Sequence, residues 1–149
     1  MPITKHDTWA ISEKACFAYL TDKIQDTEGV KAFVGSLPPQ AYDCWYFELQ
    51  GGGEEIDYEL NMDTKGGCGE WMMNAQVVGR FAEREDAQML GSILRSMLPT
   101  EENEIKGIFR FRPRSVPRLE RDDTVDDGEG GMIPLTKITY ELEVIIKES

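Results

Sequence analysis

The chain has 149 residues, with 28 acidic against 16 basic side chains and a formal net charge of −12. A chain of this length fits one domain over residues 1–149 that can bury a core without disulfides or a metal. Its 40% hydrophobic and 30% charged residues exclude a disordered chain. No apolar run approaches the roughly 18–20 residues of a bilayer span, and the negative charge argues against sequence-specific nucleic acid binding.

The N-terminus and the cysteines favour a cytosolic product. Residues 1–7 lack the apolar core of a secretory signal. The three cysteines have no Cys-x-x-Cys spacing, which argues against a disulfide framework and a zinc site. We therefore expect reduced thiols at Cys16, Cys44 and Cys68.

A helix is predicted over residues 8–25, because apolar side chains recur there at helical spacing. Asp7 or Thr8 can accept hydrogen bonds from the first-turn amides, and Gly29 follows the expected end. Glu13 is the one charged residue on the apolar stripe. The stripe consists of Trp9, Glu13, Cys16, Phe17, Leu20 and Ile24.

Two strands are predicted next, from alternating apolar residues over 44–49 and 55–62. The glycines at 51–53 turn the chain between them, so we expect an antiparallel hairpin. A third strand is predicted over 70–81. The period then changes, and a second helix is predicted over 84–98, ending before Pro99.

A fourth strand is predicted over 105–112, with Ile108 as an exception to its alternation, and a last strand over 137–147. The residues between them, 113–131, are rich in Pro, Arg, Asp and Gly and predict a long, partly mobile loop. Amphipathic helices and strands with one apolar face favour an α+β fold. We expect a two-layer sandwich, in which a mostly antiparallel sheet carries both helices on one face and exposes its other face and its edges.

No group of residues forms a recognisable catalytic or metal site. His6 is the only histidine and lies near the terminus, where an oriented base is hard to build. The glycine clusters at 51–53 and 66–69 lack the features of a phosphate loop. The acidic run at 122–129 fails the register of a calcium loop, because Val125 and Pro134 stand where oxygen ligands are required. We therefore expect no enzyme and assign no metal and no cofactor.

One basic segment stands out, with five arginines within twelve positions beside the acidic run. Two interpretations stay open. The arginines can pair locally with the neighbouring carboxylates, or they can dock a partner, because arginine favours bidentate contacts and prolines reduce the cost of ordering. The candidate partner-binding residues are Arg110, Arg112, Arg114, Arg118 and Arg121.

The order of elements over residues 9–146 resembles the tail-terminator proteins of long-tailed bacteriophages, the lambda minor tail protein U group. The features that carry the resemblance are the N-terminal helix, the aromatic strand with Trp45 and Phe47, Ala75 to Gly79 leading into a helix with Asp86-Ala87, Leu90-Gly91 and Leu98-Pro99, the strand from Ile105 to Phe111, and the closing strand from Tyr140 to Val144.

This resemblance implies a non-enzymatic virion protein that forms a ring on the end of the tail tube, expected to be a hexamer. The ring halts tube polymerisation and docks head-completion proteins. The implied partners are copies of the chain itself, the tail tube protein and the head–tail connector protein, without a membrane. The implied location is the virion tail, and the host cytoplasm during assembly.

Two other classes of function stay open. A small cytosolic ligand-binding domain or enzyme would use the concave sheet face and Cys68, and would need an enclosed pocket with converging polar groups. An adaptor would bind an acidic partner through the Arg110–Arg121 segment, with an affinity that falls as salt rises.

Overall fold

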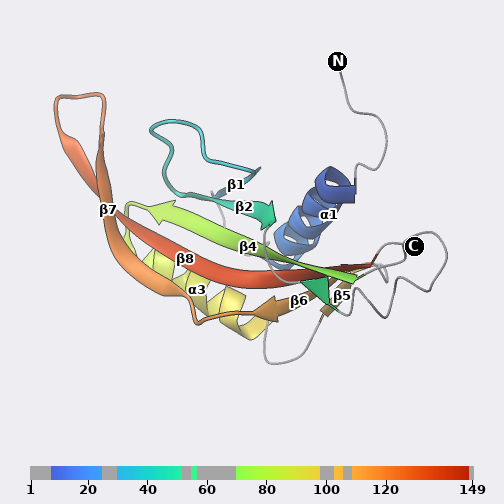
Figure 1. The fold of residues 1–149 in the computed structure, drawn as a ribbon. Coiled ribbons are helices and arrows are strands. Elements are labelled where there is room, and N and C mark those ends of the chain that lie inside the picture. Colours follow the sequence, from blue (N-terminus) through green and yellow to red (C-terminus); the bar gives the residue numbers. More distant parts are fainter. Residues whose placement is uncertain are drawn as a thin grey trace, which may run out of the picture.

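The computed structural model describes residues 8–24, 30–51, 55–56, 70–97, 103–105 and 109–147. Over these residues the chain is a two-layer α+β sandwich of two helices and eight strands, which confirms the predicted fold class (Figure 1). The elements in chain order are α1 (Thr8–Lys23), β1 (Lys31–Val34), β2 (Cys44–Gly51), β3 (Glu55–Ile56), β4 (Glu70–Phe81), α3 (Arg84–Met97), β5 (Asn103–Ile105), β6 (Phe109–Pro113), β7 (Arg118–Asp126) and β8 (Met132–Lys147).

The strands form one sheet in the order β1-β2-β4-β8-β6-β5, with β3 also paired to β4 and β7 also paired to β8. Among the described strands, β1 and β2 run parallel and the other pairs are antiparallel. The centre of the sheet is β8, which pairs with β4 along one edge and with both β6 and β7 along the other.

The register places the apolar residues of β2, β4 and β8 on one face, because side chains alternate between the faces of a strand. Leu49, Ala75 and Leu142 face one another across the three strands, and the next rows repeat the pattern. These side chains are buried and make up one continuous core. The other two rows are Phe47, Val77 and Tyr140, and Trp45, Gly79 and Ile138.

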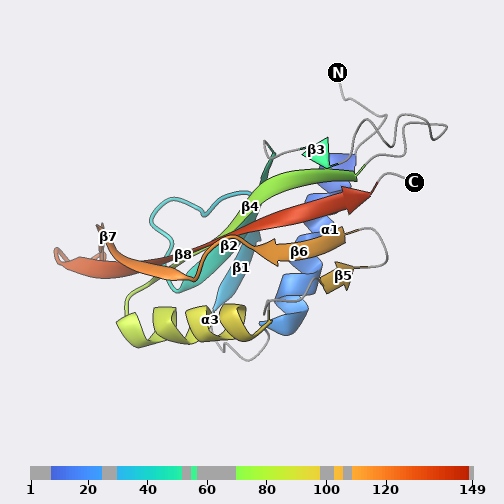
Figure 2. The same ribbon diagram turned by 60° about the horizontal axis from the view of Figure 1, so that its bottom comes forward.

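Both helices cover this same face. From α1, the Phe17 ring lies 5.7 Å from that of Trp45, and the Tyr19 ring lies 5.4 Å from that of Phe111. Buried residues of α3, including Leu90, belong to the same core. Figure 2 shows α1 crossing behind the strands while α3 lies beside β7 and β8.

The predicted stripe of α1 is confirmed at its buried positions, and its exception has a structural reason. Cys16, Leu20 and Ile24 are buried, whereas the Glu13 carboxylate accepts a hydrogen bond of 2.9 Å from the backbone N–H of Leu49. Because β1 ends opposite Phe47, no residue of β1 lies opposite Leu49. Glu13 thus satisfies a donor on the edge of the sheet beyond the end of β1. Asp7, Gly29 and the side chain of Trp9 lie outside the described residues.

The strand over 70–81 and the helix over 84–98 are confirmed by β4 and α3, but the predicted hairpin is wrong in its pairing. Both β2 and β3 pair with β4, with Glu55 opposite Trp71. Alternation within a strand identifies its buried face but not the strand with which it pairs. The long β4 pairs along one edge with both β2 and β3. Residues 57–62 of the predicted second strand lie outside the described residues.

The region after α3 also differs from its prediction. The single strand predicted over 105–112 is two strands, β5 and β6, paired with each other; Ile108 between them lies outside the described residues. The loop predicted over 113–131 is wrong, because β7 occupies 118–126 and pairs with β8, which begins at Met132. Because β7 has polar residues on both faces, its sequence lacks the alternation that predicts a strand. The strand forms through backbone pairing with β8. The short β1 was not predicted.

Replacing Gly79 by Ala should destabilise the fold. A Cβ at this position would lie 2.6 Å from Phe81, and 3.0 Å from each of Ile138 and Leu90. Alanine restricts the unfolded chain, which favours folding by about 0.5–1 kcal/mol, but overpacking of this kind costs about 1–3 kcal/mol. Urea unfolding should therefore show a net loss of stability. The control is Met89→Ala, at an α3 side chain that is 55% exposed, and it should change stability by less than about 0.5 kcal/mol. An equally stable Gly79→Ala protein would contradict this packing.

Candidate functional site

A two-stranded arm extends from the sheet because β7 and β8 continue past the end of β4. The last β4 pair joins Phe81 to Thr136, and among the described strands residues 132–135 pair with β7 alone. We call residues 122–135 the hairpin arm. Figure 1 shows it projecting away from the helices and from β4.

The arm ends in a tight turn that its own carboxylates stabilise. Asp126 Oδ1 accepts a hydrogen bond of 2.8 Å from the N–H of Gly128. Asp127 Oδ1 accepts bonds of 2.7 Å from Glu129 N–H and 2.9 Å from Gly131 N–H, and these bonds lower the pKa of the Asp127 carboxyl. Hydrogen bonds to backbone donors are the ordinary role of aspartate in turns. Asp126 and Asp127 of the acidic run therefore have a structural role that requires no bound cation.

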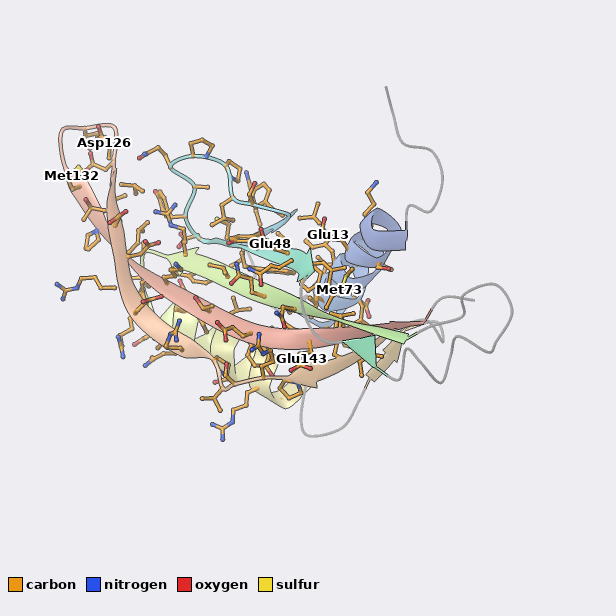
Figure 3. The ribbon with its side chains drawn as sticks, viewed as in Figure 1. Glu13, Glu48, Met73, Asp126, Met132 and Glu143 are labelled. Atoms are coloured by element: carbon orange, nitrogen blue, oxygen red, sulfur yellow. The ribbon has the colours of Figure 1, made fainter. Side chains whose placement is uncertain are left out.

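The arm is acidic and ends beside an exposed apolar side chain. Residues 122–135 include five carboxylates and no lysine, arginine or histidine. At the base of the arm, Asp122 Oδ2 pairs with Arg80 Nε at 2.6 Å. At its end, Met132 lies opposite Asp126 and is 60% exposed (Figure 3). Methionine is enriched at protein contact surfaces, whose rims are polar.

The arginine segment does not pair locally with the acidic run among the described residues. Arg114 Nη1 donates to Asn74 Oδ1 at 3.0 Å, and its Nε lies 3.6 Å from Glu143 Oε1. Asp122, in the acidic run, pairs instead with Arg80 of β4. Arg118 and Arg121 are exposed and have no ion pair within the part of the chain that the structure describes.

The register places four of the five arginine positions on the helix-free face, with Arg114 bonded there to Asn74, and only Arg121 on the other face. Arg118 lies opposite Thr139 and Arg121 opposite Thr136, and these positions alternate between the two faces of β8. Arg121 is therefore on the face that the helices cover, and Arg118 on the helix-free face. Arg110 and Arg112 lie in β6, opposite residues 145 and 143 of β8, and their side chains lie outside the described residues.

The helix-free face carries a hydrogen-bonded polar row. Gln76 Nε2 donates to Glu48 Oε1 at 3.1 Å and to the Tyr46 hydroxyl at 3.4 Å, and Gln50 Nε2 donates to the same Glu48 oxygen at 3.0 Å. Burial, and then the nearby Glu48 charge, raise the pKa of Tyr46. Within the described residues, the side-chain hydrogen-bond partners of Glu48 are the amides of Gln76 and Gln50.

A groove that sequence analysis did not predict lies between α3 and the segment joining β6 to β7. Its volume is about 320 Å³, and α3 approaches β8 closely beside it because Gly91 has no side chain; a Cβ there would lie 2.7 Å from Ile138 Cδ1. Residues far apart in sequence form the groove, so no local pattern announces it. Its walls include Gln88, Ser92 and Arg95 from α3, Val116 and Pro117 from the facing segment, and Leu119 from β7.

The described cysteines are not nucleophiles at neutral pH. Cys16 and Cys44 are free and buried. Burial raises the pKa of Cys44 to about 11, with Arg80 lowering it and Asp43 raising it. Burial and the Glu13 charge raise the pKa of Cys16 further still. A thiol with such a pKa is protonated and unreactive at pH 7. Cys68 and His6 lie outside the described residues, as does the glycine cluster at 66–69.

Two further features are absent from the described residues. They hold no group of three or more His, Cys, Asp or Glu side chains that could bind a metal ion. None of the described helices is long and apolar enough to cross a membrane.

No family model matches this chain, and no curated protein matches it either. Function is therefore inferred from the geometry of the arm, the groove and the sheet.

The stability of the protein should fall between about pH 9 and pH 11, in part because of Cys44. The unfolded thiol ionises near its ordinary pKa of 9.0, whereas the folded thiol resists ionisation until about 11. The stabilisation is complete below pH 9 and is lost as pH rises through the folded pKa, and two pKa units correspond to about 2–3 kcal/mol. Urea unfolding at pH 7, 9 and 11 should show a shallower loss for Cys44→Ala than for the unsubstituted protein. Equal slopes would contradict this assignment, since Cys16 and the tyrosines are present in both proteins.

Proposed function

We propose that this protein is a structural subunit of a bacteriophage tail, which closes into a ring on the end of the tail tube, stops tube polymerisation and docks head-completion proteins. The observation that best supports the proposal is the hairpin arm, which reaches beyond its own sheet and presents exposed acidic and apolar side chains. The order of elements, which resembles that of phage tail terminators, is consistent with it.

Ring formation requires a contact between two different surfaces of the same chain. Such heterologous contacts generate a closed ring when the rotation between subunits closes, and the ring then has unlike top and bottom faces. The arm, on one side of the subunit, and the groove beside α3 are two unlike surfaces of this kind. Unlike faces suit a ring that meets a tail tube protein on one side and a connector protein on the other.

The acidic composition is compatible with a ring through which DNA passes. A net charge of −12 repels the phosphate backbone, so the wall of the bore would not retain the nucleic acid. The number of subunits is taken as six because of the resemblance alone. The protein would act in the virion tail, after assembly in the host cytoplasm.

The described cavities favour this proposal over a ligand-binding domain or an enzyme. Arg95 is the one charged residue in the wall of the groove beside α3, and that wall holds no carboxylate or histidine. A second hollow of about 470 Å³, beside Ser115 to Leu119, has Arg118 and Glu141 in its walls, but both hollows open to solvent. Neither is enclosed as a small-molecule site usually is.

The proposal predicts that the purified protein binds the ends of tail tubes. Native mass spectrometry of the protein should show a closed oligomer, either alone or after tube ends are added. Electron microscopy should show one added disc per capped end and shorter tubes when the protein is present during polymerisation. The control is an unrelated acidic protein of similar size and charge, which should leave tube length unchanged. A monomer that ignores tubes and does not alter their length would refute the proposal.

A further inference from the structure

We infer that the end of the hairpin arm of one copy docks into the groove beside α3 of a second copy. The occupant of the groove is thus a second copy of this chain, through its residues 123–132. The inference rests on the proposed function for its biological role, because it names the two surfaces through which the subunits of a ring would join.

Charge complementarity supports this pairing. Asp123, Asp126, Asp127 and Glu129 are exposed on the arm, with no basic residue between positions 122 and 135 to neutralise them. The groove contributes Arg95, which is exposed and has no ion pair among the described residues.

The other charges near the groove do not cancel its positive character. Arg121 projects from the helix-covered face two residues beyond Leu119, about 7 Å along the strand. Arg84 and Glu85, one turn before Gln88 on α3, offset each other in charge. Lys137 and Glu120 pair at 3.9 Å on the helix-free face and take no part.

The apolar parts of the two surfaces also match. Met132 is 60% exposed at the end of the arm, and Val116 is 64% exposed at the lip of the groove. Leu119 and Ile138 also line the groove, and part of its opposite wall is the side-chain-free Gly91. A flexible thioether adapts to such a groove, and a central apolar contact with a charged rim is the usual arrangement of a protein interface.

The arm cannot reach the groove of its own subunit. Leu119, at the groove, and Asp126, at the end of the arm, lie on the same strand, seven residues or about 23 Å apart. Pairing with β8 on both sides of the irregularity at residues 123–124 holds the arm away from α3, as Figures 1 and 3 show. The contact must therefore join two copies, and it joins unlike surfaces, as a ring requires.

Charge reversal tests the pairing directly. The arm variant is Asp123→Lys with Glu129→Lys, which spares the carboxylates that hold the turn, and the groove variant is Arg95→Glu with Arg121→Glu. Sedimentation velocity should show self-association weakened about tenfold or more in each variant, because like charges then face one another. The chain with all four substitutions should recover association, since the charges are opposite again. The control, Asp22→Lys with Glu83→Lys, makes the same charge change at exposed sites away from both surfaces and should associate like the unsubstituted protein. Urea unfolding midpoints establish that all variants fold.

Disulfide trapping tests the same contact when association is weak. One preparation carries Met132→Cys and another carries Ser92→Cys, both with Cys68→Ser. Mild oxidation of the mixture should yield linked heterodimers, whereas Met132→Cys mixed with Asp22→Cys should yield few.

The results separate this inference from the proposed function. No trapping above the control, or unchanged self-association in both charge variants, would overturn the arm-to-groove contact even if tube ends are still capped. If disulfide trapping and charge rescue succeed but the protein does not bind tail tubes, the arm-to-groove contact is supported and the tail function is refuted.

Discussion

Backbone pairing along β8 is the constraint on which the rest of this molecule depends. This strand has 16 residues, whereas its partner β4 has 12, and it pairs with different strands along its two edges. Because side chains alternate, a slip of one residue would turn Ile138, Tyr140, Leu142 and Val144 from the core to the opposite face. The buried face therefore sets the register, and the register sets how far β8 extends past β4. The hairpin arm is that excess length.

The same register determines where the helices lie. Leu90 of α3 and Phe17 of α1 contact one apolar surface. The other face carries hydrogen-bonded polar side chains such as Glu48 and Gln76, together with a few buried apolar ones such as Val78 and Ile145. Close approach of α3 depends on Gly79 in β4 and Gly91 in the helix, where side chains would collide with the core. The groove beside α3 is thus a by-product of close helix–sheet packing.

Charge segregation is what the proposed self-association requires of a chain with a net charge of −12. Copies of such a chain repel one another at long range, so contact requires surfaces on which the sign of the charge differs locally. Carboxylates concentrate on the arm, and Arg95 and Arg121 are exposed on the helix-covered side. In the proposed contact, charges within a Debye length of about 8–10 Å would act more strongly than distant ones, which are screened. Shape then decides which surfaces meet.

The sequence by itself determined the elements with one apolar face: helix α1, strands β2 and β4, helix α3 and the second half of β8, and with them the α+β class. Periodicity reveals these because burial repeats every 3.6 or two residues along the chain. Tertiary structure alone decided that β2 pairs with β4, that β7 is a strand rather than a loop, and that Arg121 is separated from the other arginines of its segment. It also decided the arm and the groove. These features depend on backbone pairing and packing between distant segments, which leave no periodic trace in the residues that form them.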